Sequence, residues 1–174
     1  MIRKISAVCI ILCFSFTILV MMTPLRESGS AFLQAQGFSN NSNTTTANGT
    51  KTVQITTADS NAPTDGNSLD IGLQIQPFPI TKNVDSEFMI KFLQPSSQTV
   101  QVHVDYDFAI TKNNNEVFRA SSITGQPLLH TAEGTVKIPY KFTQDGEYSL
   151  QVSVMGINFI PIKTEQALFE LKVS

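Results

Sequence analysis

Residues 100–110 read VQVHVDYDFAI and make up the longest alternating row of the chain. Successive side chains of a β-strand point to opposite faces, so a period of two predicts a strand with one buried and one solvated face. Every second position of this row is apolar, namely Val100, Val102, Val104, Tyr106, Phe108 and Ile110. The row therefore predicts a half-buried strand at the centre of a folded domain.

Shorter rows of the same kind fill the rest of residues 69–174, at 69–75, 88–92, 136–142, 148–154 and 169–173, with short strands at 117–118 and 128–129. Gly, Pro, Asn and Asp separate them. No stretch longer than a turn has the pattern of a helix. This spacing predicts an all-β antiparallel sandwich of seven or eight strands. Pro139 cannot donate to a ladder, so its strand is expected to be an edge strand or to carry a bulge.

The row from Tyr148 to Val154 is typical of the strand that carries the tyrosine corner of immunoglobulin-like domains, because Gly146 precedes the tyrosine by two residues. Antibody domains place a core cysteine two positions after that tyrosine, where this chain has Leu150, and the chain has no tryptophan. We therefore expect an Ig-like, Greek-key sandwich that is not a true immunoglobulin domain.

The first 31 residues have the parts of an export signal. Arg3 and Lys4 precede an apolar run at 5–22, and small residues follow at 28–31. The run exceeds the usual signal core of about 7–15 residues and approaches the ~20 that span a bilayer. Two fates remain open: cleavage and secretion, or a signal-anchor transmembrane helix that holds the domain outside the cell. Both cysteines lie in this segment, so the exported part has no disulfide, no thiolate nucleophile and no type I copper site.

Residues 32–68 are interpreted as a linker. Two thirds of residues 39–68 are Ser, Thr, Asn or Gly, a composition that predicts a flexible tether. Val53 and Ile55 alternate with polar residues and allow a short edge strand. Three N-glycosylation sequons, at Asn40, Asn43 and Asn48, all fall here, and their clustering favours glycosylation over chance.

The polar residues most suited to metal binding or catalysis are the only two histidines, His103 and His130, together with Asp105, Asp107 and Glu133. His103, Asp105 and Asp107 are expected on one face of their strand, with neighbours about 6.6–6.8 Å apart. Two imidazoles and a carboxylate suit copper(II) or zinc, so His103, Asp105 and His130 form a candidate metal site. A solvated outer face is the simpler interpretation and is favoured, because a HxDxD row is a weak motif.

No catalytic motif is present. Asp105 and Asp107 have the separation of a glycosidase carboxylate pair, yet structural carboxylates are the favoured interpretation, and we expect no enzyme activity. Residues 69–174 hold eleven acidic and eight basic residues and no basic stripe, so a nucleic-acid partner is not expected.

Two apolar stretches interrupted by proline form a candidate surface for a protein partner. They are expected to meet at one end of the sandwich, and the residues concerned are Phe78, Ile80, Phe159, Ile160 and Ile162. If exposed, they would form a contact patch. If buried, they would close the open end of the core, which is the favoured alternative.

Three segments, HVDYDF at 103–108, QPLLHTAEG at 126–134 and GINFIPI at 156–162, resemble small exported β-domain proteins of ammonia-oxidising archaea. The resemblance covers most of residues 69–174 and implies a location and a fold class, since the family has no established activity. The function expected from the sequence is an extracytoplasmic, membrane-tethered interaction or envelope-structural module without a cofactor. The alternative is an extracytoplasmic domain that handles copper or zinc through His103 and His130.

Overall fold

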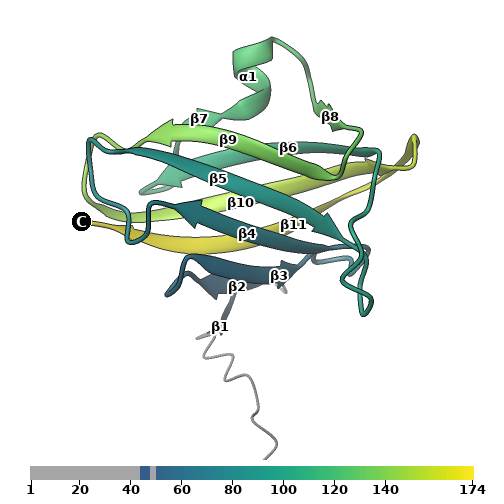
Figure 1. The fold of residues 1–174 in the computed structure, drawn as a ribbon, viewed down its shortest axis with the longest axis horizontal. Helices are drawn as coiled ribbons and strands as arrows, with labels where there is room; N and C mark the ends of the chain where they lie inside the picture. The colour runs from purple at the N-terminus through teal and green to yellow at the C-terminus, as the bar shows by residue number, and fades with distance from the viewer. Residues whose placement is uncertain (1–43, 48–49) are drawn as a thin grey trace, which may run out of the picture. The chain divides into compact units, whose positions relative to one another are not determined.

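The computed structural model describes residues 44–47 and 50–174, which form two β-sheets packed face to face (Figure 1). The strand order of the first sheet is β1 (Thr44–Ala47), β2 (Thr50–Gln54), β11 (Ile160–Val173), β10 (Gly146–Ile157), β6 (Val104–Lys112) and β7 (Asn115–Arg119), and β8 (Leu129–Thr131) also pairs with β6. The order of the second sheet is β3 (Asp59–Pro63), β4 (Asp70–Gln76), β5 (Asp85–Leu93) and β9 (Thr135–Lys141). Among the described strands, every pair is antiparallel except β2 with β11. The predicted all-β sandwich is confirmed.

The core lies between the sheets and is filled by the alternating residues of the central strands. Phe88, Ile90 and Phe92 of β5 are fully buried, as are Leu150, Val152 and Val154 of β10. The Phe88 ring contacts Phe108 of the other sheet at a centroid distance of 5.5 Å. Burial of a side chain of this size stabilises the fold by about 1.5–3 kcal/mol.

One end of the sandwich, the closed end, is covered by the chain itself and lies beside the C-terminus (Figure 1, left). The Ile80 side chain is fully buried there, and its carbonyl accepts a hydrogen bond from the Ser174 amide at 3.1 Å. The Tyr148 hydroxyl donates to the Gln144 carbonyl at 2.8 Å, which is the hydrogen bond of a tyrosine corner. The rings of Phe142 and Tyr148 meet edge to face at 4.7 Å. The hydrogen bond between Ser174 and Ile80 therefore holds the end of the last strand against the loop after β4.

The sandwich begins earlier than residue 69. Residues 50–54 form β2 and residues 59–63 form β3, where the sequence predicts a flexible linker. Val53, Ile55 and Ala62 are buried and belong to the core. The composition of this region is polar because its strands lie at or near sheet edges and need only a few apolar side chains. The domain boundary at residue 69 is thus corrected. The short strand allowed by Val53 is present as β2, but it lies between β1 and β11 rather than at the edge of the sheet.

Two further differences concern the ends of strands. The row that starts at Val100 enters its strand only at Val104, because His103 adopts a positive φ of 53° that interrupts the extended backbone. The last strand is longer than residues 169–173, since β11 begins at Ile160.

A five-residue helix, α1 (Ala120–Thr124), also follows β7. Pro139 lies on β9, an edge strand of the second sheet, as predicted.

The predicted signal or anchor at residues 1–31 and the sequons at Asn40, Asn43 and Asn48 lie outside the described residues. In the part of the chain that the structure describes, no helix has the length and apolar character to cross a membrane.

Candidate functional site

The strands β10 and β11 are joined by a two-residue turn at the end of the sandwich opposite the closed end (Figure 1, right). Ile157 pairs with Ile160, and the turn residues Asn158 and Phe159 have φ angles of 51° and 65°. This is the backbone of a type I′ turn, which asparagine adopts readily. A bulky residue with a positive φ is an outlier, and such outliers concentrate at functional sites. Phe159 is such an outlier, and 69% of its surface is exposed to solvent.

The segment before β6 is fastened to this turn. The Asn158 amide donates to the His103 carbonyl at 2.8 Å, and the Gln101 side-chain amide donates to the Asn158 side-chain oxygen at 2.9 Å. Gln101 itself is buried. These bonds fix His103 beside Phe159, and the centroids of their rings are 4.4 Å apart.

His130 reaches the same place from β8. The pairing of β8 with β6 sets His130 opposite Asp105, and the His130 Nδ1 lies 2.7 Å from Asp105 Oδ1. A carboxylate can only accept, so Nδ1 is the donor, and in the neutral ring Nε2 keeps its lone pair. Gly156 leaves room for this carboxylate, since a Cβ there would stand 2.4 Å from Asp105 Oδ2.

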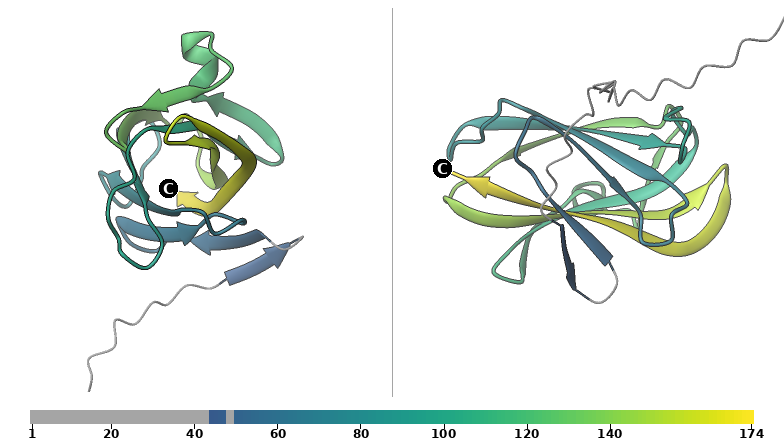
Figure 2. Two further views of the ribbon diagram at one scale, coloured as in Figure 1. Left: turned by 90° about the vertical axis from the view of Figure 1, so that its right-hand side faces the viewer. Right: turned by 90° about the horizontal axis from the view of Figure 1, so that it is seen from below.

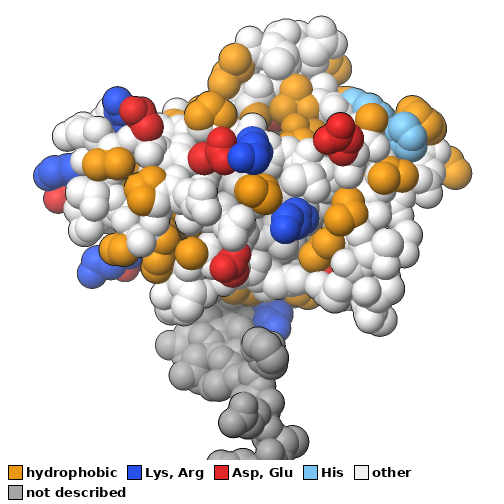
Figure 3. All heavy atoms as spheres, viewed as in Figure 1, with side chains coloured by type: hydrophobic (Ala, Val, Ile, Leu, Met, Phe, Trp, Pro, Cys, Tyr) orange, Lys and Arg blue, Asp and Glu red, His pale blue; other side chains and the backbone are white. Residues whose placement is uncertain are grey.

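The three rings of His103, His130 and Phe159 form one cluster, called the tip cluster below. The two imidazole centroids are 5.7 Å apart, and the His130 and Phe159 rings are stacked at 5.5 Å. Figure 3 shows both histidines at one edge of the molecule with hydrophobic side chains around them. Nδ1 of His103 is buried and has no hydrogen-bond partner among the described residues, which costs about 1–3 kcal/mol.

Asp107 is not part of this cluster. Its carboxylate accepts a hydrogen bond from Arg119 at 2.7 Å and one from the Ser121 amide, at the start of α1, at 3.1 Å. Burial alone would raise the pKa of Asp107, but the hydrogen bonds from Arg119, Ser121 and the Phe108 amide outweigh it and hold the pKa below its ordinary value. Asp107 therefore anchors the β7–α1 segment, which leads on to β8.

The candidate metal residues are brought together only in pairs. Asp105 contacts His130, and His130 faces His103. Within residues 44–47 and 50–174, no three His, Cys, Asp or Glu side chains gather closely enough to hold a metal ion by themselves. Glu133 is exposed.

The two apolar stretches do not meet, which corrects the expectation of a shared end. Ile80 is fully buried and Phe78 half-buried in the loop after β4, at the closed end, whereas Phe159 and Ile160 are exposed at the turn and Ile162 is half-buried beside it. They separate because β10 and β11 place the turn at one end and Ser174 at the other.

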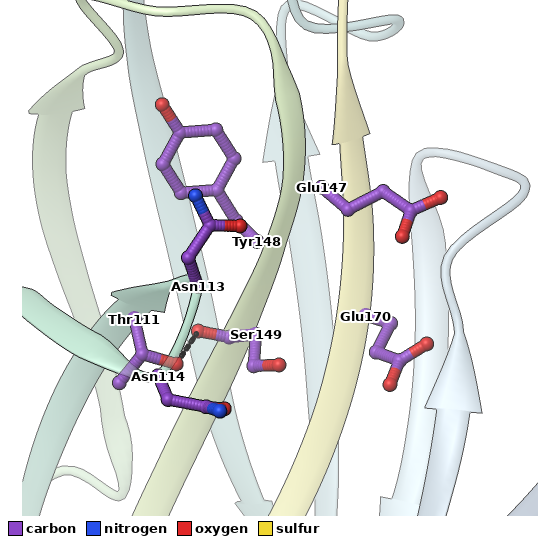
Figure 4. A pocket seen from close by; sticks show the side chains of 7 residues that line it. All are labelled: Thr111, Asn113, Asn114, Glu147, Tyr148, Ser149 and Glu170. Atoms are coloured by element: carbon purple, nitrogen blue, oxygen red, sulfur yellow. Dashed lines mark hydrogen bonds between the residues drawn. The ribbon is translucent and has the colours of Figure 1, made fainter.

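A shallow depression lies on the first sheet away from the tip cluster (Figure 4). Its volume is about 170 Å³, and it is lined by Thr111, Asn113, Asn114, Glu147, Tyr148, Ser149 and Glu170. Small-molecule sites usually occupy about 300–1,000 Å³ and are largely apolar. This depression is smaller and polar, so the tip cluster is the stronger candidate.

Three residues that position the tip cluster were missed in the sequence: Gln101, Gly156 and Asn158. Asn158 carried a usable signal, because asparagine at the first position of a two-residue hairpin turn is typical of the I′ type. The roles of Gln101 and Gly156 depend on which strands are neighbours.

No family model matches the chain, and no curated protein matches it. Among solved structures, the crystal structure of the PmoD soluble domain from Methylocystis sp. ATCC 49242 (Rockwell) is similar to 61% of this chain and 92% of its own, with 15% identity and a TM-score of 0.37. A TM-score this low supports no inference about fold or function.

Proposed function

We propose that this protein is an extracytoplasmic β-sandwich, tethered to the membrane by its N-terminal segment, that acts as an interaction module. The observation that carries the proposal is the exposure of Phe159 and Ile160 at the β10–β11 turn. The export signal in the sequence and the resemblance to exported archaeal β-domains support the location. The resemblance implies no activity, so the role rests on the surface.

The turn has the features of a contact site rather than of a loose loop. Two hydrogen bonds, from the Asn158 amide to the His103 carbonyl and from Gln101 to the Asn158 side chain, hold it in place. An aromatic ring that is already ordered loses little entropy on binding, and aromatic residues dominate the energetics of protein interfaces. A protein partner with an apolar pocket for Phe159 is the chemistry that fits this surface.

The proposal is tested by replacing Phe159 with a photo-crosslinking amino acid in the full chain, expressed in cells that export it. Ile123 on α1 is the matched control, because it is 73% exposed against 69% for Phe159. We expect one discrete crosslinked product from position 159 and none from position 123. Protease added to intact cells should digest the sandwich, which tests the location separately.

The same crosslink should disappear when Ile160 is changed to Ser, because the neighbouring apolar contact is lost. Equal labelling from positions 159 and 123 would contradict a specific contact site. Resistance of the sandwich to protease on intact cells, with digestion only after lysis, would contradict the location.

We also propose that the sandwich is an Ig-like variant of the Greek-key class. The tyrosine corner formed by Tyr148 and Gln144 supports this, together with the position of β10 between β6 and β11 in the first sheet. The extra β1–β2 hairpin and the parallel contact of β2 with β11 are then additions to that pattern.

A further inference from the structure

We propose that His103 and His130 together bind one divalent transition-metal ion, copper(II) or zinc, at the tip cluster. The proposal does not depend on a protein partner and goes beyond the proposed interaction function. Its first observation is that the two histidines, distant in the sequence, lie close together in the fold. The chain has two histidines, 27 positions apart in sequence, and the fold sets their rings against each other at 5.7 Å.

The first donor is Nε2 of His130. Metal-ligating histidines commonly donate their other ring N–H to a carboxylate, which fixes the tautomer and makes the ligating nitrogen more basic. Asp105 accepts such a bond from Nδ1 of His130 at 2.7 Å. The side chain of His130 is 36% exposed, so an ion can reach it from solvent.

The second donor is His103. Its Nδ1 is buried without a hydrogen-bond partner among the described residues, and a buried unpaired nitrogen in a folded protein calls for an explanation, a bound ion being one. Its backbone is fixed by the bond from the Asn158 amide. The Phe159 ring packs against the His103 ring at a centroid distance of 4.4 Å and is itself mostly exposed.

The geometry defines an open site rather than a closed one. Metal–nitrogen bonds of about 2.0–2.1 Å require the two nitrogens to lie within about 4 Å of each other. The centroids of the stacked rings are 5.7 Å apart, so binding of a shared ion requires the two rings to turn their ligating nitrogens toward each other. No third His, Cys, Asp or Glu completes the set in the described part of the chain, so the remaining coordination positions fall to water or to an outside donor. Imidazole ligands without thiolate suit copper(II) and zinc.

The competing explanation is that the three rings pack for stability alone, as aromatic rings often do. Packing accounts for the stacking of His130 on Phe159. It does not account for the burial of an unpaired polar nitrogen, which phenylalanine at position 103 would avoid. A metal site predicts one bound ion per chain that depends on both histidines, whereas packing alone predicts no such ion.

The test is calorimetric titration of copper(II) and of zinc into the detergent-purified full chain, made without a polyhistidine tag. Wild type is compared with His103→Ala, His130→Ala and the double variant, whose residual binding measures sites elsewhere in the chain. We expect one equivalent that is lost in either single variant, with no further loss in the double. Asp105→Asn keeps both ligands and should weaken binding about 10–100-fold. In the copper(II) form, electron paramagnetic resonance should show coupling to two nitrogens.

Phe159→Ala is the cross-control, because it removes the apolar contact of the interaction proposal and leaves both imidazoles. It should retain the metal equivalent, whereas His103→Ala and His130→Ala should lose it. Circular dichroism establishes that each variant is folded before it is titrated. Absence of wild-type binding, or wild-type affinity in either folded single variant, would overturn the proposal and leave the interaction function untouched.

Discussion

The sandwich has an aromatic cluster at each end, and the two differ in what covers them. At the closed end, Phe142 packs edge to face against Tyr140 at 4.8 Å and against Tyr148 at 4.7 Å, and the C-terminus closes over the neighbouring loop. At the tip, His103, His130 and Phe159 stack with one side in solvent. The right panel of Figure 2 shows the C-terminus and the β10–β11 turn at opposite ends of the sandwich. Similar aromatic side chains are thus covered by the chain at one end and exposed to solvent at the other.

The largest loss of stability is expected from a substitution of Phe142, at the closed end. Phe142→Ala leaves a cavity under the closed end, and the free energy of unfolding should fall by about 3–5 kcal/mol. Urea unfolding followed by circular dichroism measures this, since the chain lacks tryptophan. A loss under about 1 kcal/mol would show that the closed end is not where the stability resides.

Removal of the Asp107 carboxylate should have the next largest effect. Asp107→Ala removes one of the two carboxylates that pair with the Arg119 guanidinium, leaves two backbone amides without their acceptor, and should cost about 3 kcal/mol at neutral pH. Because the folded-state pKa of Asp107 is lowered, its stabilisation is present above the ordinary aspartate pKa and is lost as the pH falls through the lowered value. The stability of wild type and variant should therefore converge in acid. Parallel stability curves down to low pH would contradict this assignment.

Tyr148→Phe tests the closed end more gently. It removes only the hydroxyl that donates to the Gln144 carbonyl and keeps the ring in place, so the free energy of unfolding should fall by about 1 kcal/mol. Thermal unfolding by calorimetry measures the difference. Tyr140→Phe is the matched control, because no hydrogen bond from the Tyr140 hydroxyl forms within the described residues, and it should be nearly neutral.

The smallest effect on stability is expected at the tip. Phe159→Ala exposes no core, and the free energy of unfolding should change by less than about 0.5 kcal/mol. The same urea titration applies. A loss comparable to that of Phe142→Ala would remove the distinction between the two ends and make the Phe159 ring a structural element.

The core could be predicted from the sequence because its signal is local. Phe88, Ile90 and Phe92 alternate with polar residues, and the structure buries all three. The first half of β11 was missed because residues 160–166 are exposed or half-buried and carry no alternation. β3 was missed for a related reason, since Ala62 is its only buried residue and a single small side chain gives no pattern.

For the tip cluster, the sequence predicts which residue types could bind a metal but not how they are arranged in space. The residue types pointed to His103 and His130, but their meeting depends on β8, a three-residue strand whose register sets His130 opposite Asp105. Asp107 was expected on the same solvated face as Asp105, and it is α1 that covers it. The exposure of Phe159 and the burial of Ile80 likewise depend on which segments cover each end, which alternation does not encode.

The parallel pairing of β2 with β11 has a consequence for the order in which the fold is completed. Gln54 and Glu170, which are neighbours across these strands, stand 116 positions apart in the chain. A ribosome makes the chain from its N-terminus, so β2 can pair with β1 early, but the edge of β2 that faces β11 has no partner until almost the whole domain has been made. Contacts of such long sequence separation slow folding, and an unpaired strand edge is open to association with other chains. Completion of the first sheet is therefore a late event, timed by the arrival of the last residues.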